Sequence, residues 1–153
     1  MTTTRCDRFA MPTRPSKGAE LLVDTSVAVA LVVADHEHHT ETSEALAKRR
    51  LGLAGHAAFE TFSVLSRLPP PARRTPAAIA RLLEAGFSHP RFLSDDGAAA
   101  LFADLASRGI AGGSVYDALV GAAAAEHRLT LVTRDRRALE TYRAVGAVVE
   151  LLP

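Results

Sequence analysis

Cysteine is almost absent from this chain of 153 residues, since Cys6 is the only one. A single cysteine excludes an internal disulfide framework and a metal site built from several cysteines. It also fits the reducing environment of the cytoplasm. Long apolar runs are missing as well, because none approaches the ~20 residues that a membrane-spanning helix needs. We therefore expect a cytoplasmic protein with no membrane partner.

Neither sign of charge is in excess. The formal net charge is +1, so the strongly basic footprint of many nucleic-acid-binding proteins is absent. No lysine follows Lys48. The arginines gather in short groups, which are often no more than solvated surface. They could also contact phosphate, because the guanidinium group offers it a bidentate fork. The candidate phosphate contacts are Arg73, Arg74, Arg134, Arg136 and Arg137.

Length and composition fit one globular domain. Hydrophobic residues make up 48% of the chain and charged residues 23%, which is ordinary for a folded protein. Residues 1–19 mix basic residues and prolines without an apolar core, so they do not resemble a secretory signal. We interpret residues 1–19 as a flexible N-terminal arm and residues 20–153 as the folded domain.

Short apolar runs alternate with segments of helical periodicity. The expected strands are 21–23, 51–54, 91–93, 129–132 and 147–151. The expected helices are 27–33, 40–50, 57–68, 73–85, 97–108, 115–127 and 136–142. This alternation predicts an α/β fold of three layers, in which a mostly parallel sheet of four to five strands is flanked by helices.

Four acids occupy related positions in this pattern. Asp24 ends the first strand and Asp135 follows the fourth, while Glu60 and Asp117 lie in the first turns of two helices. Each alone could be a helix cap or an acid favoured by the helix dipole. Together they should meet at the edge where ligands bind in open α/β sheets. Clustered carboxylates raise one another's pKa unless a cation is present, and oxygen donors favour Mg²⁺ or Mn²⁺.

The segments around these acids resemble a known family. They read Val-Asp-Thr-Ser at 23–26, Val-Tyr-Asp-Ala-Leu at 115–119 and Leu-Val-Thr-Arg-Asp at 131–135, with Glu60 on a helix between the first two. In this order they are similar to the PIN-domain ribonucleases, specifically the VapC-type toxins of toxin–antitoxin systems. The resemblance covers about residues 20–152 and implies a PIN-like fold.

The resemblance also implies a function. It implies an endoribonuclease that depends on Mg²⁺ or Mn²⁺, cleaves structured cellular RNA such as tRNA or rRNA, and is neutralised by a cognate VapB-type antitoxin. It further implies a homodimer. Asp24, Glu60, Asp117 and Asp135 match the family's acidic quartet, with Asp24 and Asp117 expected as the most direct metal ligands. Ser26 and Thr133 match its polar support positions.

Other functions fit these residues less well or remain as alternatives. A phosphatase with an aspartate nucleophile would need a second acid where Ser26 stands, and a later lysine to neutralise the phosphoryl group. Dinucleotide binding would need a glycine-rich turn after the first strand. A zinc site on His36, His38 and His39 has no second cluster of ligands. A catalytically silent PIN-like scaffold or interaction module remains the alternative, and it would bind a partner without cutting RNA.

Overall fold

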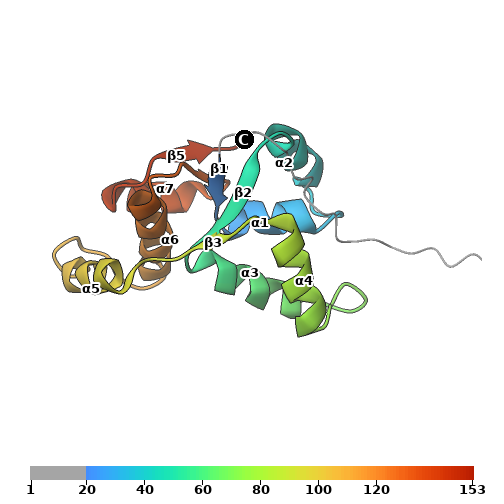
Figure 1. The fold of residues 1–153 in the computed structure, drawn as a ribbon, viewed down its shortest axis with the longest axis horizontal. Helices are drawn as coiled ribbons and strands as arrows, with labels where there is room; N and C mark the ends of the chain where they lie inside the picture. The colour runs from blue at the N-terminus through green and yellow to red at the C-terminus, as the bar shows by residue number, and fades with distance from the viewer. Residues whose placement is uncertain (1–19) are drawn as a thin grey trace, which may run out of the picture.

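A five-stranded sheet forms the centre of the fold (Figure 1). The computed structural model describes residues 20–153, so the predicted N-terminal arm and Cys6 lie outside the described residues. The strands are β1 (Glu20–Val23), β2 (Arg50–Ala54), β3 (Pro90–Arg91), β4 (Leu131–Thr133) and β5 (Val149–Leu151). They are ordered β3-β2-β1-β4-β5, and every neighbouring pair is parallel. The predicted three-layer α/β fold is thus confirmed, with a sheet that is parallel throughout.

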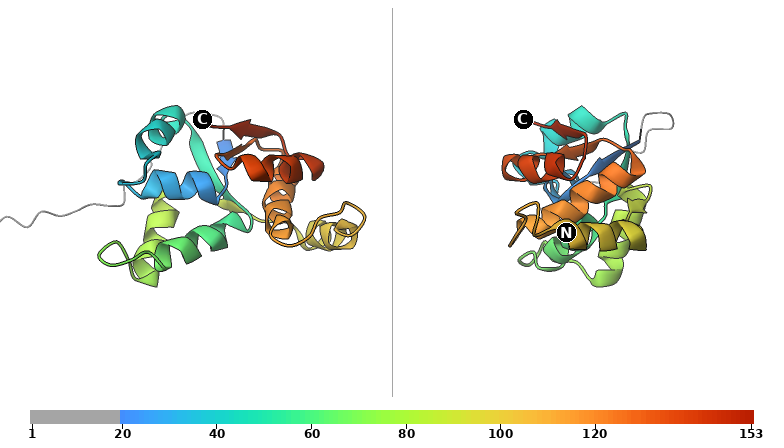
Figure 2. Two further views of the ribbon diagram at one scale, coloured as in Figure 1. Left: turned by 180° about the vertical axis from the view of Figure 1, so that it is seen from behind. Right: turned by 90° about the vertical axis from the view of Figure 1, so that its left-hand side faces the viewer.

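Helices cover both faces of the sheet. Four of them precede β3: α1 (Thr25–Val32), α2 (His39–Leu46), α3 (Ala57–Ser66) and α4 (Pro76–Gly86). Three follow it: α5 (Asp95–Asp104), α6 (Ser114–His127) and α7 (Leu139–Ala144), the last preceded by a 3₁₀ turn over Arg136–Ala138. Seen from behind, α1, α3 and α4 lie on one side of the sheet and α6 and α7 on the other (Figure 2). No helix within residues 20–153 is long and apolar enough to cross a membrane.

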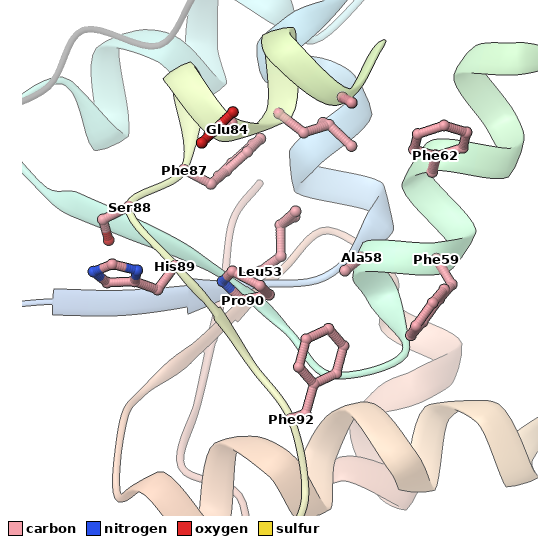
Figure 3. Close-up of a pocket in the computed structure, with 12 residues that line it drawn as sticks. Leu53, Ala58, Phe59, Phe62, Glu84, Phe87, Ser88, His89, Pro90 and Phe92 are labelled. Carbon is pink, nitrogen blue, oxygen red and sulfur yellow. The ribbon is translucent and has the colours of Figure 1, made fainter. Parts of the chain in front are cut away.

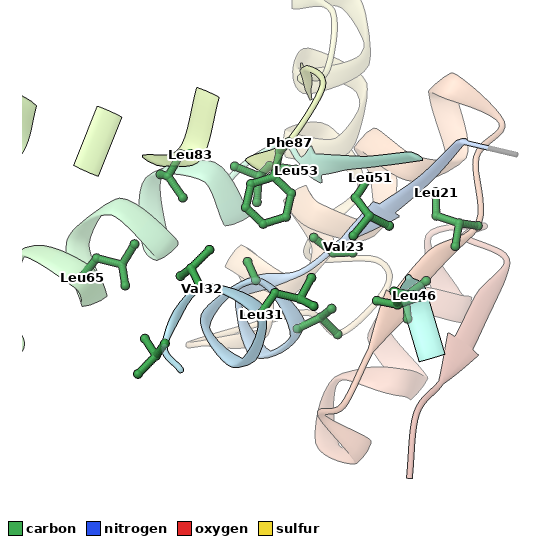
Figure 4. Packing of buried hydrophobic residues seen from close by; sticks show 14 of the residues in the cluster. Leu21, Val23, Leu31, Val32, Leu46, Leu51, Leu53, Leu65, Leu83 and Phe87 are labelled. Carbon is green, nitrogen blue, oxygen red and sulfur yellow. The ribbon is translucent and has the colours of Figure 1, made fainter. Parts of the chain in front are cut away.

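The alternation of side chains along β1 divides the core in two. Leu21 and Val23 point into a cluster with buried residues of the first four helices (Figure 4). Leu22 points the opposite way, into a second cluster that includes Val120 of α6 and Tyr142 of α7. Because β1 is buried on both faces, it is apolar at every position after Glu20. The carboxyl end of this strand, where Asp24 follows, is therefore held firmly in the middle of the molecule.

Several predicted boundaries were wrong, for local reasons. The helix expected over 40–50 ends at Leu46, because Arg50 pairs in register with Glu20 and belongs to β2. The helix expected over 97–108 begins at Asp95, because the side chain of Ser94 caps it by accepting from the Gly97 N–H. The third strand covers Pro90–Arg91 rather than 91–93. The elements themselves occur in the predicted order.

Candidate active site

Asp24 is the best-anchored acid of the predicted quartet. It follows β1 and caps α1, and only 4% of its surface is exposed. Its Oδ1 accepts hydrogen bonds from the Ser26 hydroxyl at 2.6 Å and the Val27 N–H at 3.2 Å. Its Oδ2 accepts from the Thr133 hydroxyl and, at 2.9 Å, from the Tyr142 phenol. These four donors fix the orientation of the Asp24 carboxylate.

Burial and hydrogen bonding act in opposite directions on the pKa of Asp24. Desolvation is the larger effect and raises the pKa above its usual value, while the hydrogen bonds from Ser26, Thr133, Tyr142 and Val27 lower it. The buried environment therefore disfavours the ionised form of Asp24, and the four donors stabilise that form in part.

Two hydroxyls connect Asp24 to the loop after β4. The Ser26 hydroxyl donates to Asp24 and accepts from the Arg134 N–H at 2.9 Å. The Thr133 hydroxyl donates to Asp24 and accepts from the Asp135 N–H at 2.9 Å. Each hydroxyl therefore works as donor and acceptor at once. This arrangement places Asp135 next to Asp24 across two neighbouring parallel strands.

The other two acids come from helix N-termini. Glu60, in the first turn of α3, accepts from the Thr25 hydroxyl at 3.0 Å. Asp117 lies in the first turn of α6 and is partly buried. Burial raises the pKa of the Asp117 carboxyl, and the negative charges of Asp135, Glu60 and Asp24 raise it further. The four acids therefore interact electrostatically at one edge of the sheet.

The arrangement fits a hydrated divalent cation better than a closed cage. In the part of the chain that the structure describes, no group of three or more His, Cys, Asp or Glu side chains is arranged so that it could hold a metal ion. Mg²⁺, however, keeps several waters and is commonly held by one or two carboxylates. The donors here are carboxylate oxygens, and a cation would relieve the repulsion that acts on Asp117.

The three histidines after α1 lie in a turn in which two of their rings make hydrogen bonds to the backbone. The ring of His39 donates from Nδ1 to the Ala30 carbonyl at 2.8 Å, which ties it to α1. The ring of His36 instead accepts from the His38 N–H at 3.1 Å. Within residues 20–153 no metal-binding group of three such side chains is present. The turn is therefore organised by its own hydrogen bonds.

Arg134, one of the predicted phosphate contacts, is held by protein groups. Its side chain is 9% exposed, donates to the Thr42 hydroxyl at 3.3 Å and lies 3.6 Å from a carboxylate oxygen of Glu41. These contacts join the loop after β4 to α2. Arg134 thus connects the loop that carries Asp135 to α2.

The remaining predicted arginines fall into two groups. Arg137 is exposed and its Nε lies 3.3 Å from Oδ1 of Asp135, and Arg136 lines a hollow on the same loop. Arg73 and Arg74 instead lie between α3 and α4. The ten residues of α3 span about 15 Å, which separates this pair from the acids. Arg136 and Arg137 are therefore the arginines of the set that flank the acidic edge.

Tyr142 was not identified from the sequence, although its phenol bonds directly to Asp24. It is 2% exposed and comes from α7, far along the chain from β1. The only signal in the sequence is one tyrosine on a short helix that follows Asp135. That signal does not distinguish a core residue from a partner of the site.

Comparison with known proteins gives consistent matches. Residues 21–144 match the family model described as the PIN domain. Ribonuclease VapC27 of Mycobacterium tuberculosis is 49% identical over 129 residues, which cover 84% of this chain and 94% of that protein. Ribonuclease VapC40 of the same species is 44% identical over 131 residues, which cover 84% of this chain and 96% of that protein.

Solved structures share the fold. VapBC2 from Rickettsia felis, bound to a DNA fragment from its promoter, has a TM-score of 0.63 at 16% identity and covers 88% of this chain and 99% of that one. DNA-bound VapBC from Salmonella typhimurium has a TM-score of 0.61 at 20% identity and covers 87% and 98%. At such identities these structures show the fold alone. The family assignment rests on the sequence matches, and by them the chain belongs to the PIN-domain family and, within it, to the VapC-type ribonucleases.

Proposed function

We propose that this protein is a metal-dependent endoribonuclease toxin of the cytoplasm, and that a cognate VapB-type antitoxin neutralises it. The observation that carries the proposal is the convergence of Asp24, Glu60, Asp117 and Asp135 at the carboxyl edge of the sheet, where the hydroxyls of Thr25 and Thr133 connect the loops that hold them. Carboxylates that raise one another's pKa are typical of active sites that bind a cation.

The acids and the two hydroxyl residues of the site would have different roles. Asp24 and Asp117 would hold Mg²⁺ or Mn²⁺ most directly, and Glu60 and Asp135 would either hold it through water or bind a second ion. The cation would polarise the scissile phosphate and lower the pKa of a bound water. Ser26 and Thr133 keep Asp24 in one orientation, because a misplaced carboxylate would bind the cation and substrate less well.

The proposed substrate is structured RNA, such as tRNA or rRNA, and the proposed assembly is a homodimer that an antitoxin can cover. The names of the relatives support a ribonuclease. The structural relatives are VapBC pairs in complex with DNA, which supports a VapB-type partner for this chain.

Cleavage of total cellular RNA by purified, antitoxin-free protein tests the proposal. Discrete products should form with Mg²⁺ or Mn²⁺ and disappear with EDTA, and gel electrophoresis followed by sequencing of the ends would identify the RNA. Circular dichroism would establish that the protein is folded in every reaction. A folded protein that cuts no RNA with either metal would favour the catalytically silent scaffold.

Arg137 offers a test of the RNA contacts. Arg137→Ala is expected to weaken RNA binding a few-fold at low salt and to make the dependence of binding on salt less steep by about one unit, because one phosphate contact and its counterion are lost. Fluorescence anisotropy of a labelled RNA at several salt concentrations measures both. Arg73→Ala, in the loop between α3 and α4, is the matched control and should change neither. An unchanged salt slope for Arg137→Ala would remove Arg137 from the phosphate contacts.

A further inference from the structure

An exposed strip of aromatic rings lies beside the acids. The rings of His56 and Tyr116 are stacked, with centroids 4.9 Å apart and an interplanar angle of 18°. The ring centroid of Phe59 lies 6.2 Å from that of His56, and the ring centroid of Phe92 lies 5.6 Å from that of Phe59. Phe59 is 64% exposed and Tyr116 50%. We call these four residues the aromatic strip.

The strip adjoins the acidic edge at two points. Phe59 directly precedes Glu60 on α3, and Tyr116 directly precedes Asp117 on α6. Phe59 and Glu60 line the same hollow together with His56, so the Phe59 ring borders the site beside one of its acids. His56 completes the connection between the two helices by stacking on Tyr116.

A hollow of about 430 Å³ continues from Glu60 along α3. His56 and Phe59 line one end of it, and Arg67 lies at the other. Its volume falls within the range of pockets that take small organic ligands. Aromatic rings, the Glu60 carboxylate and the Arg67 guanidinium thus line one space.

We propose that the aromatic strip stacks an unpaired nucleobase of the RNA and so positions the neighbouring phosphate at the acids. The inference rests on the proposed function and adds to it the residues that would hold a base of the RNA. Sequence-selective proteins recognise unpaired RNA by stacking its bases on aromatic side chains. Each stacked base contributes ~1–3 kcal/mol.

A protein segment is the competing occupant, since Phe59 and Phe92 also border an apolar groove of about 590 Å³ between α3, α4 and β3. Figure 3 shows both rings beside this groove, with Phe62 farther along α3. His56 and Tyr116 do not line the groove. A segment seated in the groove would therefore contact Phe59 but not the stacked pair next to Asp117. The continuity of that pair with the acids favours RNA as the occupant of the strip.

Binding of RNA in EDTA tests the inference separately from cleavage. The probes are a fluorescein-labelled twelve-nucleotide oligoadenylate, an abasic strand of the same length, and a twelve-base-pair RNA duplex. The wild type should bind oligoadenylate more tightly than either other probe. Phe59→Ala and Tyr116→Ala should each weaken that binding about tenfold, and Tyr116→Phe should restore it. Phe102→Ala is the matched control, because Phe102 is 80% exposed on α5.

Leucine variants distinguish stacking from docking of a protein segment. Phe59→Leu and Tyr116→Leu should bind oligoadenylate as weakly as the alanine variants, because stacking needs a flat π face. Leucine variants that bind like the wild type, or a wild type that binds the abasic strand equally well, would overturn the inference. If the ring-deleted variants instead change only the oligomeric state in sedimentation, the strip is a protein interface and the inference is wrong. Intact binding without any metal-dependent cleavage would leave the inference standing and reject the proposed nuclease.

Discussion

Replacing Asp117 by asparagine is expected to abolish RNA cleavage while raising the melting temperature of the metal-free protein. The loss of activity should be on the order of 10²–10³-fold or more, as for removal of one electrostatic contact to a transition state. The gain in stability follows from the raised pKa of the Asp117 carboxyl, which burial and the charges of Asp135, Glu60 and Asp24 produce. Asparagine keeps the shape of the side chain and removes the repulsion.

The gain in stability should depend on pH in a defined direction. A carboxyl whose pKa is higher in the folded than in the unfolded state stabilises the fold below its unfolded pKa, and this contribution is lost as the pH rises through the folded value. The ionised Asp117 of the wild type therefore costs most stability at neutral pH. The difference in melting temperature between Asp117→Asn and the wild type should be largest there and should disappear below about pH 4.

Asp96→Asn is the matched control for this variant. Asp96 is an exposed acid in the first turn of α5, so its removal loses only a favourable interaction with the helix dipole, about 0.3–1 kcal/mol. Its melting temperature should fall slightly and its cleavage should stay intact. Calorimetry in EDTA between pH 4 and 8 makes the comparison. A melting temperature for Asp117→Asn that falls as well would contradict the idea of a repulsive cluster.

Local sequence patterns sufficed to predict the place of each acid. Asp24 follows an apolar strand, and Asp117 and Glu60 lie in first turns, so the 2.0 and 3.6 residue periodicities bring them to one edge of a parallel sheet. The contacts of Arg134 could not be predicted in this way. A guanidinium suits phosphate, but Arg134 contacts Thr42 and Glu41, which come from a helix distant in the sequence. A pattern within one segment carries no information on such partners.

Tyr142 shows the same limit at the centre of the site. Its contact with Asp24 joins residues 118 positions apart and depends on how α7 packs on α6. Gly121 permits that packing, since a Cβ there would lie 3.1 Å from the Tyr142 Cα and 2.7 Å from a methyl of Val145. The glycine is visible in the sequence. Its consequence for Asp24 appears only when both helices are placed.

Tyr142→Phe is therefore expected to lower the free energy of unfolding by about 1.5–3 kcal/mol, as for loss of a hydrogen bond to a charged group. It should also reduce cleavage, because one oxygen of the buried Asp24 carboxylate loses a donor and the pKa of Asp24 rises further. The loss of stability should be largest at neutral pH and should shrink as Asp24 becomes protonated. Urea unfolding at several pH values and cleavage assays in Mg²⁺ measure these effects.

Tyr116→Phe is the matched control, since it removes the hydroxyl of the second of the two tyrosines and leaves Asp24 untouched. Its stability should equal that of the wild type. If Tyr142→Phe behaved in the same way, the hydroxyls of Ser26 and Thr133 would be sufficient to hold Asp24. A loss of stability and cleavage that is specific to Tyr142→Phe would mean that the Tyr142 hydroxyl is needed to hold Asp24. The close packing of α7 on α6 at Gly121 would then contribute to the site, because it places Tyr142.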